Sequence, residues 1–344
     1  MRIGILTFHW ATNYGAVLQT YALQTYLESI GHEVKVINYK SRHFDDTLWN
    51  FIKNRKFLQF ARYKNTKHKE KIISRFRDEY LNQTKRIYHY RDITDVIKGL
   101  DVIISGSDQV LTPSFLLNGE GRRVKSPAYF LDFPFDGKRI GYAVSFGCTE
   151  YPEPENQLAS DLISNFDKIG VRENTGVSIL EQLNYQKGYI VVPDPTILCY
   201  EKLFDNIRIK RKTVREYYCA YILHKIFKVD SENIYYIDET HNPLSMEDWL
   251  GTIVNSKGLI TNSYHGMIMA LLNKVPFVAI TVSTGSIGMN DRFTTLLSKL
   301  GLENRICSEN EDYMDVLTKE IDWVDVFDRI HIFSNLGKEF LKFQ

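Results

Sequence analysis

The chain has 344 residues, of which 44% are hydrophobic and 25% are charged, a composition typical of globular proteins. This length predicts two domains or one large α/β body, and the formal net charge of +1 gives no overall field that would attract nucleic acid or an acidic partner. Four scattered cysteines (Cys148, Cys199, Cys219 and Cys307) without a CxxC pair favour reduced, buried thiols over a zinc site or a disulfide framework.

The N-terminal stretch MRIGILTFHW predicts a strand that starts directly at the first residues. It contains no apolar run of the length that a signal peptide needs, and no other stretch approaches the roughly 20 apolar residues of a membrane span. We therefore expect a cytoplasmic protein, either free or peripheral on the inner face of the membrane.

Residues 1–39 have the pattern of a strand, a helix and a second strand. RIGILTF and HEVKVINY read as the strands, and Gly31 is a typical helix end. The residues that recur between them at helical spacing are Ala16, Thr20, Leu23, Leu27 and Ile30. The corner before the helix holds Asn13, Tyr14 and Gly15, at a point where α/β sheets bind ligands through free backbone N–H groups. The missing GxGxxG pattern argues against a dinucleotide there.

Residues 41–91 form a basic and aromatic insertion, with fourteen Lys and Arg against five Asp and Glu. The pattern fits two amphipathic helices. Such an insertion suits contact with an anionic membrane surface or with a phosphorylated lipid carrier. The alternative is a solvated basic face over a small satellite core.

Four further apolar strands are each followed by polar residues. They lie in LDVIISGSDQV (100–110), RIGYAVSFGC (139–148), FDKIGVREN (166–174) and GYIVVPDPTILC (188–199). In a parallel sheet the carboxyl ends of the strands share one edge, so their polar residues should line one crevice. The residues expected there are His9, Asn13, Ser107, Asp108, Ser145, Arg172 and Asp194.

The second half repeats the alternation after a polar stretch, 200–217, that we interpret as a helix and linker. YYCAYIL, NIYYID, KGLITNS and PFVAIT predict strands, and MEDWLGTIVNS, YHGMIMALLNK and NDRFTTLLSKLGL predict helices. Only nine residues separate the first two strands, fewer than a crossover helix needs, so this domain is expected to be trimmed or rearranged.

The expected domain organisation has four parts. An N-terminal Rossmann-like domain, 1–199, carries the insertion 41–91. The linker 200–217 leads to a C-terminal Rossmann-like domain, 218–325. A final helix, 326–344, is expected to pack back on the first domain.

The segment 262–266 is a polar corner in an otherwise apolar unit. Ser263 suits the N-cap of a helix that begins at Tyr264, which places His265 and Gly266 in its first turn. Free N–H groups at such a helix start attract phosphate or carboxylate. The helix dipole disfavours a proton on His265, but a bound dianion would favour it and make the side chain a general acid. The alternative is a histidine that caps its own corner without chemistry.

Three other charged residues have a functional and a structural interpretation. Arg172 has the bidentate geometry that grips a carboxylate or phosphate, or it forms an ion pair with Glu173 or Asp194. Asp108 suits a general base for a sugar hydroxyl, or an Asx turn. Arg292 lies at a helix start, where the helix dipole disfavours a cation. Either an anion binds near Arg292, or its side chain is simply exposed to solvent.

Six motifs in this order carry a resemblance to a known family: GILTFHWATNYGAVLQTYALQTYLESIGHEV, SGSDQV, AVSFG, GVREN, PDPTIL and TNSYHGMIMALLNKVPFVAI. Together they resemble the polysaccharide pyruvyltransferase family over most of residues 1–302. The resemblance implies an α/β fold of GT-B type, with two Rossmann-like domains facing each other across a cleft. It also implies transfer of the enolpyruvyl unit of phosphoenolpyruvate to two hydroxyls of a sugar, which forms a ketal and releases phosphate.

The resemblance also implies roles for individual residues. His265 matches the motif histidine and would act as the acid, and Arg172 matches the motif arginine and would clamp the donor. From their placement, Asp108 and the corner Asn13–Gly15 would hold or deprotonate the acceptor. The further residues expected to bind substrate are Ser107, Ser145, Asp194, Ser263, Tyr264, Gly266 and Arg292. No metal or redox cofactor is expected; phosphoenolpyruvate is a co-substrate, and the acceptor is a lipid-linked or nucleotide-linked sugar of a surface polysaccharide such as a capsule or exopolysaccharide.

One departure from the family pattern leaves rival functions open. Many members carry arginine before the motif histidine, where this chain has Tyr264, so Arg292, Lys274 or Lys257 would have to replace it. The first rival is a glycosyltransferase that uses a nucleotide sugar on the same scaffold. The second is a non-catalytic sugar- or anion-binding subunit of polysaccharide assembly.

Overall fold

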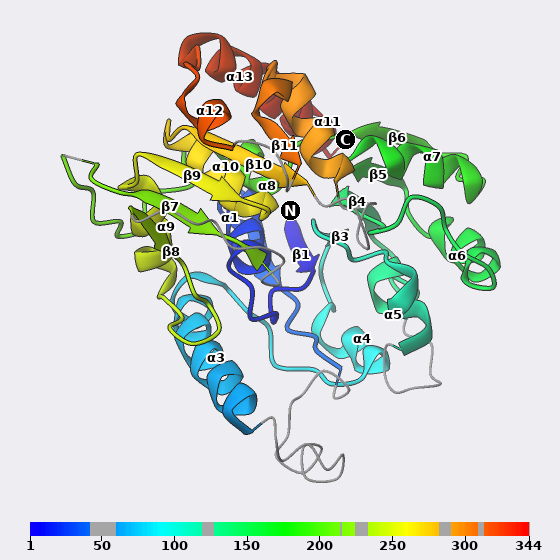
Figure 1. Ribbon diagram of the computed structural model, residues 1–344. Coiled ribbons are helices and arrows are strands. Elements are labelled where there is room, and N and C mark those ends of the chain that lie inside the picture. The colour runs from blue at the N-terminus through cyan, green and yellow to red at the C-terminus, as the bar shows by residue number, and fades with distance from the viewer. Residues whose placement is uncertain are drawn as a thin grey trace. The chain divides into compact units, whose positions relative to one another are not determined.

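The structure is a computed structural model that describes residues 1–41, 60–118, 127–213, 215–223, 233–281, 290–308 and 313–343. The chain forms two compact units, Met1–Pro195 and Thr196–Gln344. Each unit has its own parallel sheet with helices between most successive strands, as Figure 1 shows. The α/β class expected from the sequence is therefore confirmed for both units.

The first unit is built on a six-stranded parallel sheet in the order β2-β1-β3-β4-β5-β6. Its strands are β1 (Arg2–Leu6), β2 (Glu33–Val36), β3 (Val102–Ser105), β4 (Lys138–Val144), β5 (Lys168–Val171) and β6 (Gly188–Val191). The central strand β3, with the sequence VIIS, is buried along its whole length. Continuous apolar runs of this kind are what a strand covered on both faces requires, and they made the strands recognisable in the sequence.

The first unit also contains six α-helices and two short 3₁₀ helices among its described residues. They are α1 (Tyr14–Ser29), α3 (Phe60–Tyr80), η3 (Tyr90–Asp92), α4 (Ile93–Val96), α5 (Pro113–Asn118), η4 (Ala128–Phe130), α6 (Glu155–Ile163) and α7 (Asn174–Gln182). Helix α1 begins where Asn13 caps it, because the side-chain Oδ1 accepts a hydrogen bond from the amide of Ala16 at 3.2 Å. It ends before Gly31, which has φ +89° and adopts this left-handed conformation without strain.

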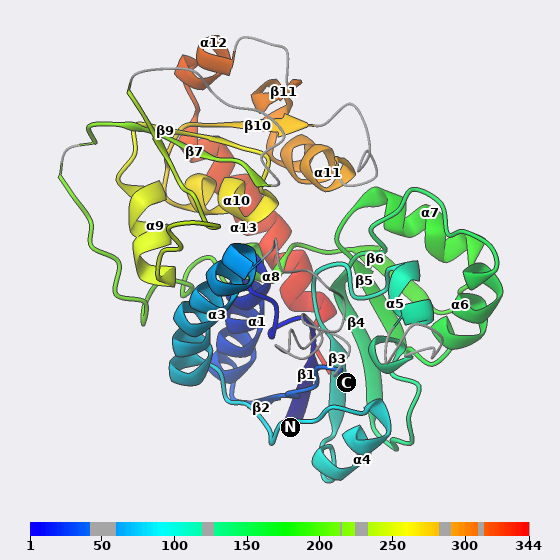
Figure 2. The same cartoon turned by 60° about the horizontal axis from the view of Figure 1, so that its bottom comes forward.

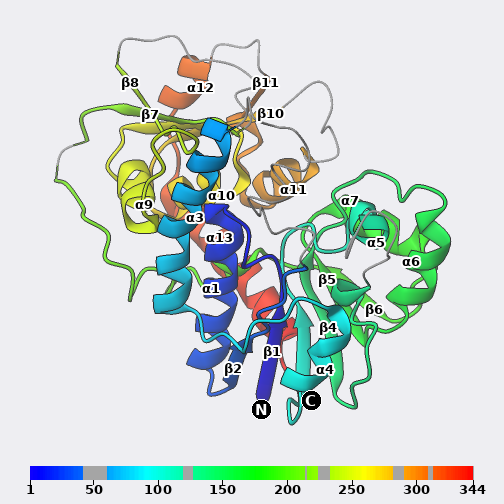
Figure 3. The same ribbon diagram turned by 90° about the horizontal axis from the view of Figure 1, so that it is seen from below.

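Helices α1 and α3 lie side by side, as Figures 2 and 3 show from two directions. Of the two helices expected in the insertion 41–91, α3 is therefore present, whereas the other falls outside the described residues together with Trp49, Phe51 and Phe57. Across the α1–α3 contact, the ring of Tyr21 packs edge-on against Phe76 with ring centroids 5.7 Å apart.

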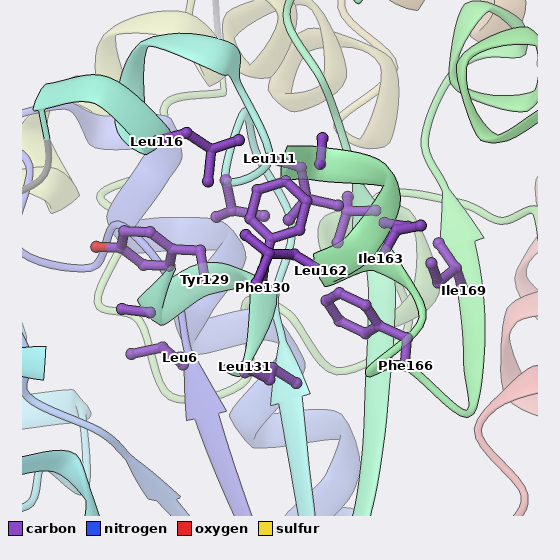
Figure 4. Close-up of a cluster of buried hydrophobic side chains, with 14 of the residues drawn as sticks. Leu6, Leu111, Leu116, Tyr129, Phe130, Leu131, Leu162, Ile163, Phe166 and Ile169 are labelled. Carbon is purple, nitrogen blue, oxygen red and sulfur yellow. The ribbon is translucent and has the colours of Figure 1, made fainter. Parts of the chain in front are cut away.

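The main core of the first unit packs against its parallel sheet. Figure 4 shows part of this core. Leu6 is the last residue of β1, Tyr129 and Phe130 belong to η4, and Phe166 lies just before β5. Phe130 and Phe166 are almost completely buried. Truncating a buried phenylalanine in a close-packed core costs roughly 3–5 kcal/mol, so this cluster gives the sheet a rigid base.

The second unit has a five-stranded parallel sheet in the order β11-β10-β9-β7-β8. Its strands are β7 (Tyr218–Tyr221), β8 (Ile234–Tyr236), β9 (Gly258–Thr261), β10 (Phe277–Thr281) and β11 (Ile306–Ser308). Strands β7 and β8 are parallel neighbours although few residues connect them. The sequence predicts that this domain is either trimmed or rearranged. Because β7 and β8 pair in parallel like the other strands, the short connection trims the domain without rearranging its sheet.

The helices of the second unit are α9 (Met246–Val254), α10 (Tyr264–Leu272), α11 (Asp291–Leu300), η7 (Glu303–Arg305), α12 (Tyr313–Thr318) and α13 (Trp323–Phe340); α8 (Pro195–Leu198) follows the boundary between the units. Helix α13 begins earlier than the expected 326 because Asp322 caps it, accepting from the amides of Val324 and Asp325. Ser334 of α13 donates a hydrogen bond to the carbonyl of Leu198, within the second unit. Packing of this helix on the first domain stays a prediction.

The helix expected within 200–217 is wrong, since the described residues of this stretch form turns and extended chain. Leu203 and Ile207 are buried at a spacing of four, which is compatible with one face of a helix. The pair Asp205-Asn206 between them favours turns, because short polar side chains compete for backbone hydrogen bonds. In the described ranges, no helix has both the length and the apolar character needed to cross a bilayer.

Candidate functional site

Four of the residues expected at the edge of the first sheet lie in contact with one another. Ser107 and Asp108 follow β3, Arg172 follows β5, and Asp194 follows β6. They meet because these strands run in parallel, so that their carboxyl ends share one edge. The centre of the group is the guanidinium of Arg172, whose side chain is fully buried.

Three carboxylates surround this guanidinium. Its Nη2 lies 3.5 Å from Asp108 Oδ1, its Nε lies 3.3 Å from Glu173 Oε2, and its Nη1 lies 3.5 Å from Asp194 Oδ2. The structural alternative for Arg172, an ion pair with Glu173 or Asp194, is therefore present with both partners and with Asp108 as a third. With all four groups ionised, the cluster carries two more negative than positive charges.

A chain of buried hydrogen bonds connects this cluster to β1 and α1. The Ser107 hydroxyl donates to Asp194 Oδ2 at 3.0 Å, and the Thr7 hydroxyl donates to the Ser107 carbonyl at 2.9 Å. The Gln19 amide in turn donates to the Thr7 hydroxyl at 3.0 Å. Thr7 and Gln19 were not identified from the sequence. Their signal was present, however, since they are polar residues within a strand–helix unit that is otherwise nearly all apolar and buried.

Replacing Thr7 by valine should lower the free energy of unfolding by about 1–3 kcal/mol. The change keeps the shape of the side chain but leaves the fully buried Gln19 amide and the Ser107 carbonyl each without one hydrogen-bond partner. Urea unfolding followed by circular dichroism measures this difference. Thr7→Ser keeps the hydroxyl and should retain most of the stability; equal stability of the wild type and Thr7→Val would contradict the assigned network.

Two non-glycine residues with positive φ lie at the same edge. Asp108 has φ +86°, and Ala143, inside β4, has φ +51° beside a register shift between β4 and β5. The altered backbone brings Ser145 N to the Asp108 carbonyl at 2.9 Å and Arg172 N to the Val144 carbonyl at 3.0 Å. Strained backbone of this kind concentrates at functional sites, where surrounding contacts hold it in place. This strain is the second indication that the edge is a site.

The corner before α1 is organised by its own contacts. Asn13 caps the helix, Tyr14 and Gly15 are buried, and Lys69 of α3 lies over the Tyr14 ring at 5.2 Å. His9 is fully buried, with Nδ1 3.1 Å from the Thr7 carbonyl and Nε2 3.2 Å from Asn38 Oδ1. Burial lowers the pKa of His9 to about 4, so this histidine is neutral near pH 7. Binding of an acceptor at this corner stays a prediction.

Ser145 is also buried, and its contacts are structural. Its hydroxyl accepts a hydrogen bond from the Gly147 amide at 3.3 Å, and its carbonyl accepts one from Leu111 at 3.2 Å. These bonds fix the loop that follows β4. Any contact of Ser145 with substrate stays a prediction.

In the second unit, the predicted corner at the start of α10 is confirmed. Ser263 is the N-cap, and its hydroxyl accepts a hydrogen bond from the Gly266 amide at 3.2 Å. Its own amide donates to Thr261 Oγ1 at 3.0 Å, and this hydroxyl donates to the Tyr221 carbonyl at 2.6 Å. Gly266 is required by close approach, because a Cβ there would lie 3.0 Å from the Tyr221 ring and 3.2 Å from Ser263.

His265 lies in the first turn of α10 beside an aromatic and cationic group. Its ring centroid is 5.5 Å from that of Tyr264, and Tyr264 packs edge-on against Phe293. The Arg292 guanidinium lies over the Tyr264 ring at 5.6 Å. Of the three cations that the sequence offers as replacements for an arginine at position 264, Arg292 therefore contacts that position. Lys274 lies beyond the other end of α10, over Phe327.

The candidate residues thus form two groups, one in each unit. The first unit brings together Ser107, Asp108, Arg172 and Asp194, and the second brings together Ser263, Tyr264, His265, Gly266 and Arg292. Convergence of His265 and Arg172 on one anion stays a prediction. In the described part of the chain, no three His, Cys, Asp or Glu side chains are arranged to hold a metal ion.

Among solved structures, the chain resembles UDP-GlcNAc 2-epimerase from Neisseria meningitidis bound to UDP-GlcNAc, with 8% identity, coverage of 98% of this chain and 94% of that one, and a TM-score of 0.53. It is also similar to a functionally uncharacterized protein from Klebsiella pneumoniae (13% identity, coverage 87% and 97%, TM-score 0.43) and to a heptosyltransferase from E. coli with ADP (13% identity, coverage 99% and 99%, TM-score 0.39). The first of these similarities supports the fold, which is of the GT-B type expected from the sequence.

No curated protein matches the chain significantly. A family model described as polysaccharide pyruvyl transferase matches residues 13–284. This range includes the edge of the first sheet from Ser107 to Asp194 and the corner at the start of α10. The chain therefore belongs to the polysaccharide pyruvyl transferase family.

Proposed function

We propose that the protein transfers the enolpyruvyl unit of phosphoenolpyruvate to two hydroxyls of a sugar in a surface-polysaccharide precursor, forming a pyruvate ketal and releasing phosphate. Family membership supports the reaction class. The observation that carries the proposal further is the difference between the two groups of residues: one is rich in carboxylates, and the other combines a helix start with a histidine and an arginine.

The carboxylate cluster of the first unit suits a neutral polyol. Arg172 already faces three carboxylates, so it offers little net positive charge to a donor that is itself anionic. Carboxylates accept hydrogen bonds from sugar hydroxyls and can remove their protons. Asp108 is the most accessible of the three, with a side chain 21% exposed against 6% for Glu173 and 0% for Asp194. We therefore assign Asp108 to the acceptor hydroxyl and Arg172 to holding Asp108, in place of the donor clamp expected from the family motif.

The α10 corner of the second unit suits the anionic donor. The positive end of the dipole of a buried helix and the nearby Arg292 guanidinium both favour a phosphate or carboxylate. We assign His265, in the first turn of this helix, to the role of acid toward a donor bound there. Arg292 supplies the charge that other family members place at position 264.

The chemistry follows from these assignments. The His265 imidazolium gives a proton to the methylene carbon of the donor, and the adjacent carbon becomes an oxocarbenium-like centre. A sugar hydroxyl attacks this centre and transfers its proton to Asp108. Phosphate then leaves with the proton held by Asp108, and an oxocarbenium-like carbon forms again. The second hydroxyl attacks this carbon and gives its proton to the neutral His265 imidazole, which closes the ketal and restores the acid. The donor undergoes no net change in oxidation state, so the reaction requires no redox cofactor.

The experiment that tests this function is phosphate release from phosphoenolpyruvate by the purified protein. The acceptors are a panel of lipid-linked and nucleotide-linked sugars that includes galactose-type residues. We expect phosphate release that depends on one acceptor, and a mass increase of that acceptor equal to pyruvate minus one water. Absence of release and of mass change across the panel would contradict the proposal.

A nucleotide-sugar glycosyltransferase is the second candidate, because the structural neighbour from Neisseria meningitidis holds UDP-GlcNAc. It predicts that UDP or ADP sugars raise the melting temperature more than phosphoenolpyruvate does. A non-catalytic subunit would bind one of these ligands without turnover. Thermal unfolding with each ligand, together with the phosphate assay, separates the three possibilities.

A further inference from the structure

Helix α3 carries a row of basic side chains on its exposed face. Successive residues of an α-helix are about 100° apart, so positions 64, 67, 68, 71 and 75 fall within an arc of about 100°. This row runs for roughly 16 Å along the helix, at about 1.5 Å per residue. All five residues are exposed, and four of them carry a fixed charge: Lys64, Lys67, Lys71 and Arg75. The fifth residue is His68.

The opposite face of α3 is fixed to the rest of the first unit. Ile73 and Phe76 are buried, and Phe76 stacks on Tyr80 with ring centroids 4.4 Å apart. Arg77 is also buried; it pairs with Glu70 and donates to the carbonyls of His9 and Ala11 in the corner before α1. The helix therefore cannot turn its basic face inward without breaking buried contacts.

The exposed face has one sign of charge between residues 64 and 75. Glu70 lies outside the arc and pairs with Arg77, and acidic residues return only at Asp78 and Glu79, at the end of the helix. A row of like charges along one exposed face raises the local positive potential, which favours an anionic partner.

We propose that the basic face of α3, defined by Lys64, Lys67, Lys71 and Arg75, binds the anionic phosphate headgroups of a lipid bilayer. A row along a helix can lie flat on such a surface with all four charges near it at once. Each lysine or arginine near an anionic surface strengthens partitioning about fivefold, the equivalent of ~1 kcal/mol. Four charges give a factor of several hundred, and the binding is reversible by salt because the row itself contains no apolar side chain to insert.

This inference rests on the proposed function only for its purpose, which is to bring the enzyme to a lipid-linked acceptor. The binding itself requires no turnover. Co-sedimentation with vesicles of phosphatidylcholine alone, or of phosphatidylcholine mixed with phosphatidylglycerol, measures it at low and at high salt. We expect the full chain to sediment with the mixed vesicles at low salt, and to remain in solution at high salt or with phosphatidylcholine alone.

The decisive variant combines Lys64→Gln, Lys67→Gln, Lys71→Gln and Arg75→Gln. Its matched control combines Lys35→Gln, Lys138→Gln, Lys202→Gln and Lys212→Gln, which removes the same charge from exposed positions elsewhere. We expect partitioning to fall at least a hundredfold in the first and less than fivefold in the control. Circular dichroism and thermal unfolding check that both variants are folded.

Three results would overturn the proposal. They are absence of wild-type binding to anionic vesicles, equal losses in the two variants, and binding that depends on the α3 face but is found with RNA and not with vesicles. Failure of phosphate release with every acceptor would contradict the proposed function and leave the vesicle result intact. Conversely, an active enzyme that ignores vesicles would contradict only the role of α3.

Discussion

Replacing His265 by glutamine is expected to slow phosphate release from phosphoenolpyruvate by about 10²–10⁴-fold, the usual contribution of a general acid. Glutamine keeps a polar side chain of similar size in the first turn of α10 but cannot supply a proton. The His265 side chain is buried beside Tyr264. Because glutamine is similar to it in size and polarity, the change should alter chemistry more than folding. The measurement is kcat with saturating donor and acceptor, with thermal unfolding as the check on folding.

A histidine outside the α10 corner makes this comparison sharper. His241→Gln is the matched control, since His241 is exposed and pairs with Asp238 on a turn. A Gln variant at position 265 with a rate within tenfold of the wild type would remove His265 from the role of acid.

Replacing Arg172 by methionine is expected to lower the free energy of unfolding by about 3–5 kcal/mol, the usual cost of breaking a buried ion pair from one side. The change leaves Asp108, Glu173 and Asp194 close together without their shared cation. Urea unfolding at pH 7 measures the loss. Arg172→Lys keeps the charge but cannot reach three carboxylates at once, so its loss should be intermediate.

The pH dependence of this loss has a definite sign. In the Met variant, the three neighbouring carboxylates repel one another while they are ionised, and acid weakens this repulsion in the folded state. The difference in stability from the wild type should therefore shrink as the pH falls. Two results would contradict an arginine whose charge is balanced by three carboxylates. The first is equal stability of the wild type and Arg172→Met at pH 7, and the second is a difference between them that grows as the pH falls.

The parts of the fold that depend on local patterns were predictable. Strands such as VIIS and GLIT are buried on both faces, so they appear in the sequence as continuous apolar runs. The Ser263 cap depends on a serine placed just before an apolar helix, which is also a local signal. Glu173 and Asp194 were recognisable in the sequence as candidate ion-pair partners of Arg172. Glu173 is the next residue in the chain, and Asp194 follows the next strand.

The parts that depend on distant contacts were not predictable. Thr7 and Ser107 are a hundred residues apart, and only the pairing of β1 with β3 brings them together. Nothing about an alanine indicates the positive φ of Ala143, which follows from the shift in register between β4 and β5. The third partner of Arg172, Asp108, depends on that same backbone geometry. Sequence patterns therefore located the edge of the sheet but not the charge balance within it.

That charge balance changes the assignment of roles. An uncompensated Arg172 would have suited the donor, as the family motif suggested. An arginine that is shared by three carboxylates holds those carboxylates in place, and the first unit then suits hydroxyl groups. In the proposed division the anion binds at the α10 corner, where the Arg292 guanidinium lies over the Tyr264 ring.

Titration calorimetry of phosphoenolpyruvate against three proteins tests this division most directly: the wild type, Arg292→Gln and Asp108→Asn. We predict that Arg292→Gln weakens donor binding by about 10–100-fold, the range expected for a lost hydrogen bond to a charged group. Asp108→Asn should leave donor binding unchanged or slightly stronger, because it removes a negative charge from the acceptor side. The reverse pattern, with donor affinity lost in Asp108→Asn and retained in Arg292→Gln, would contradict the account.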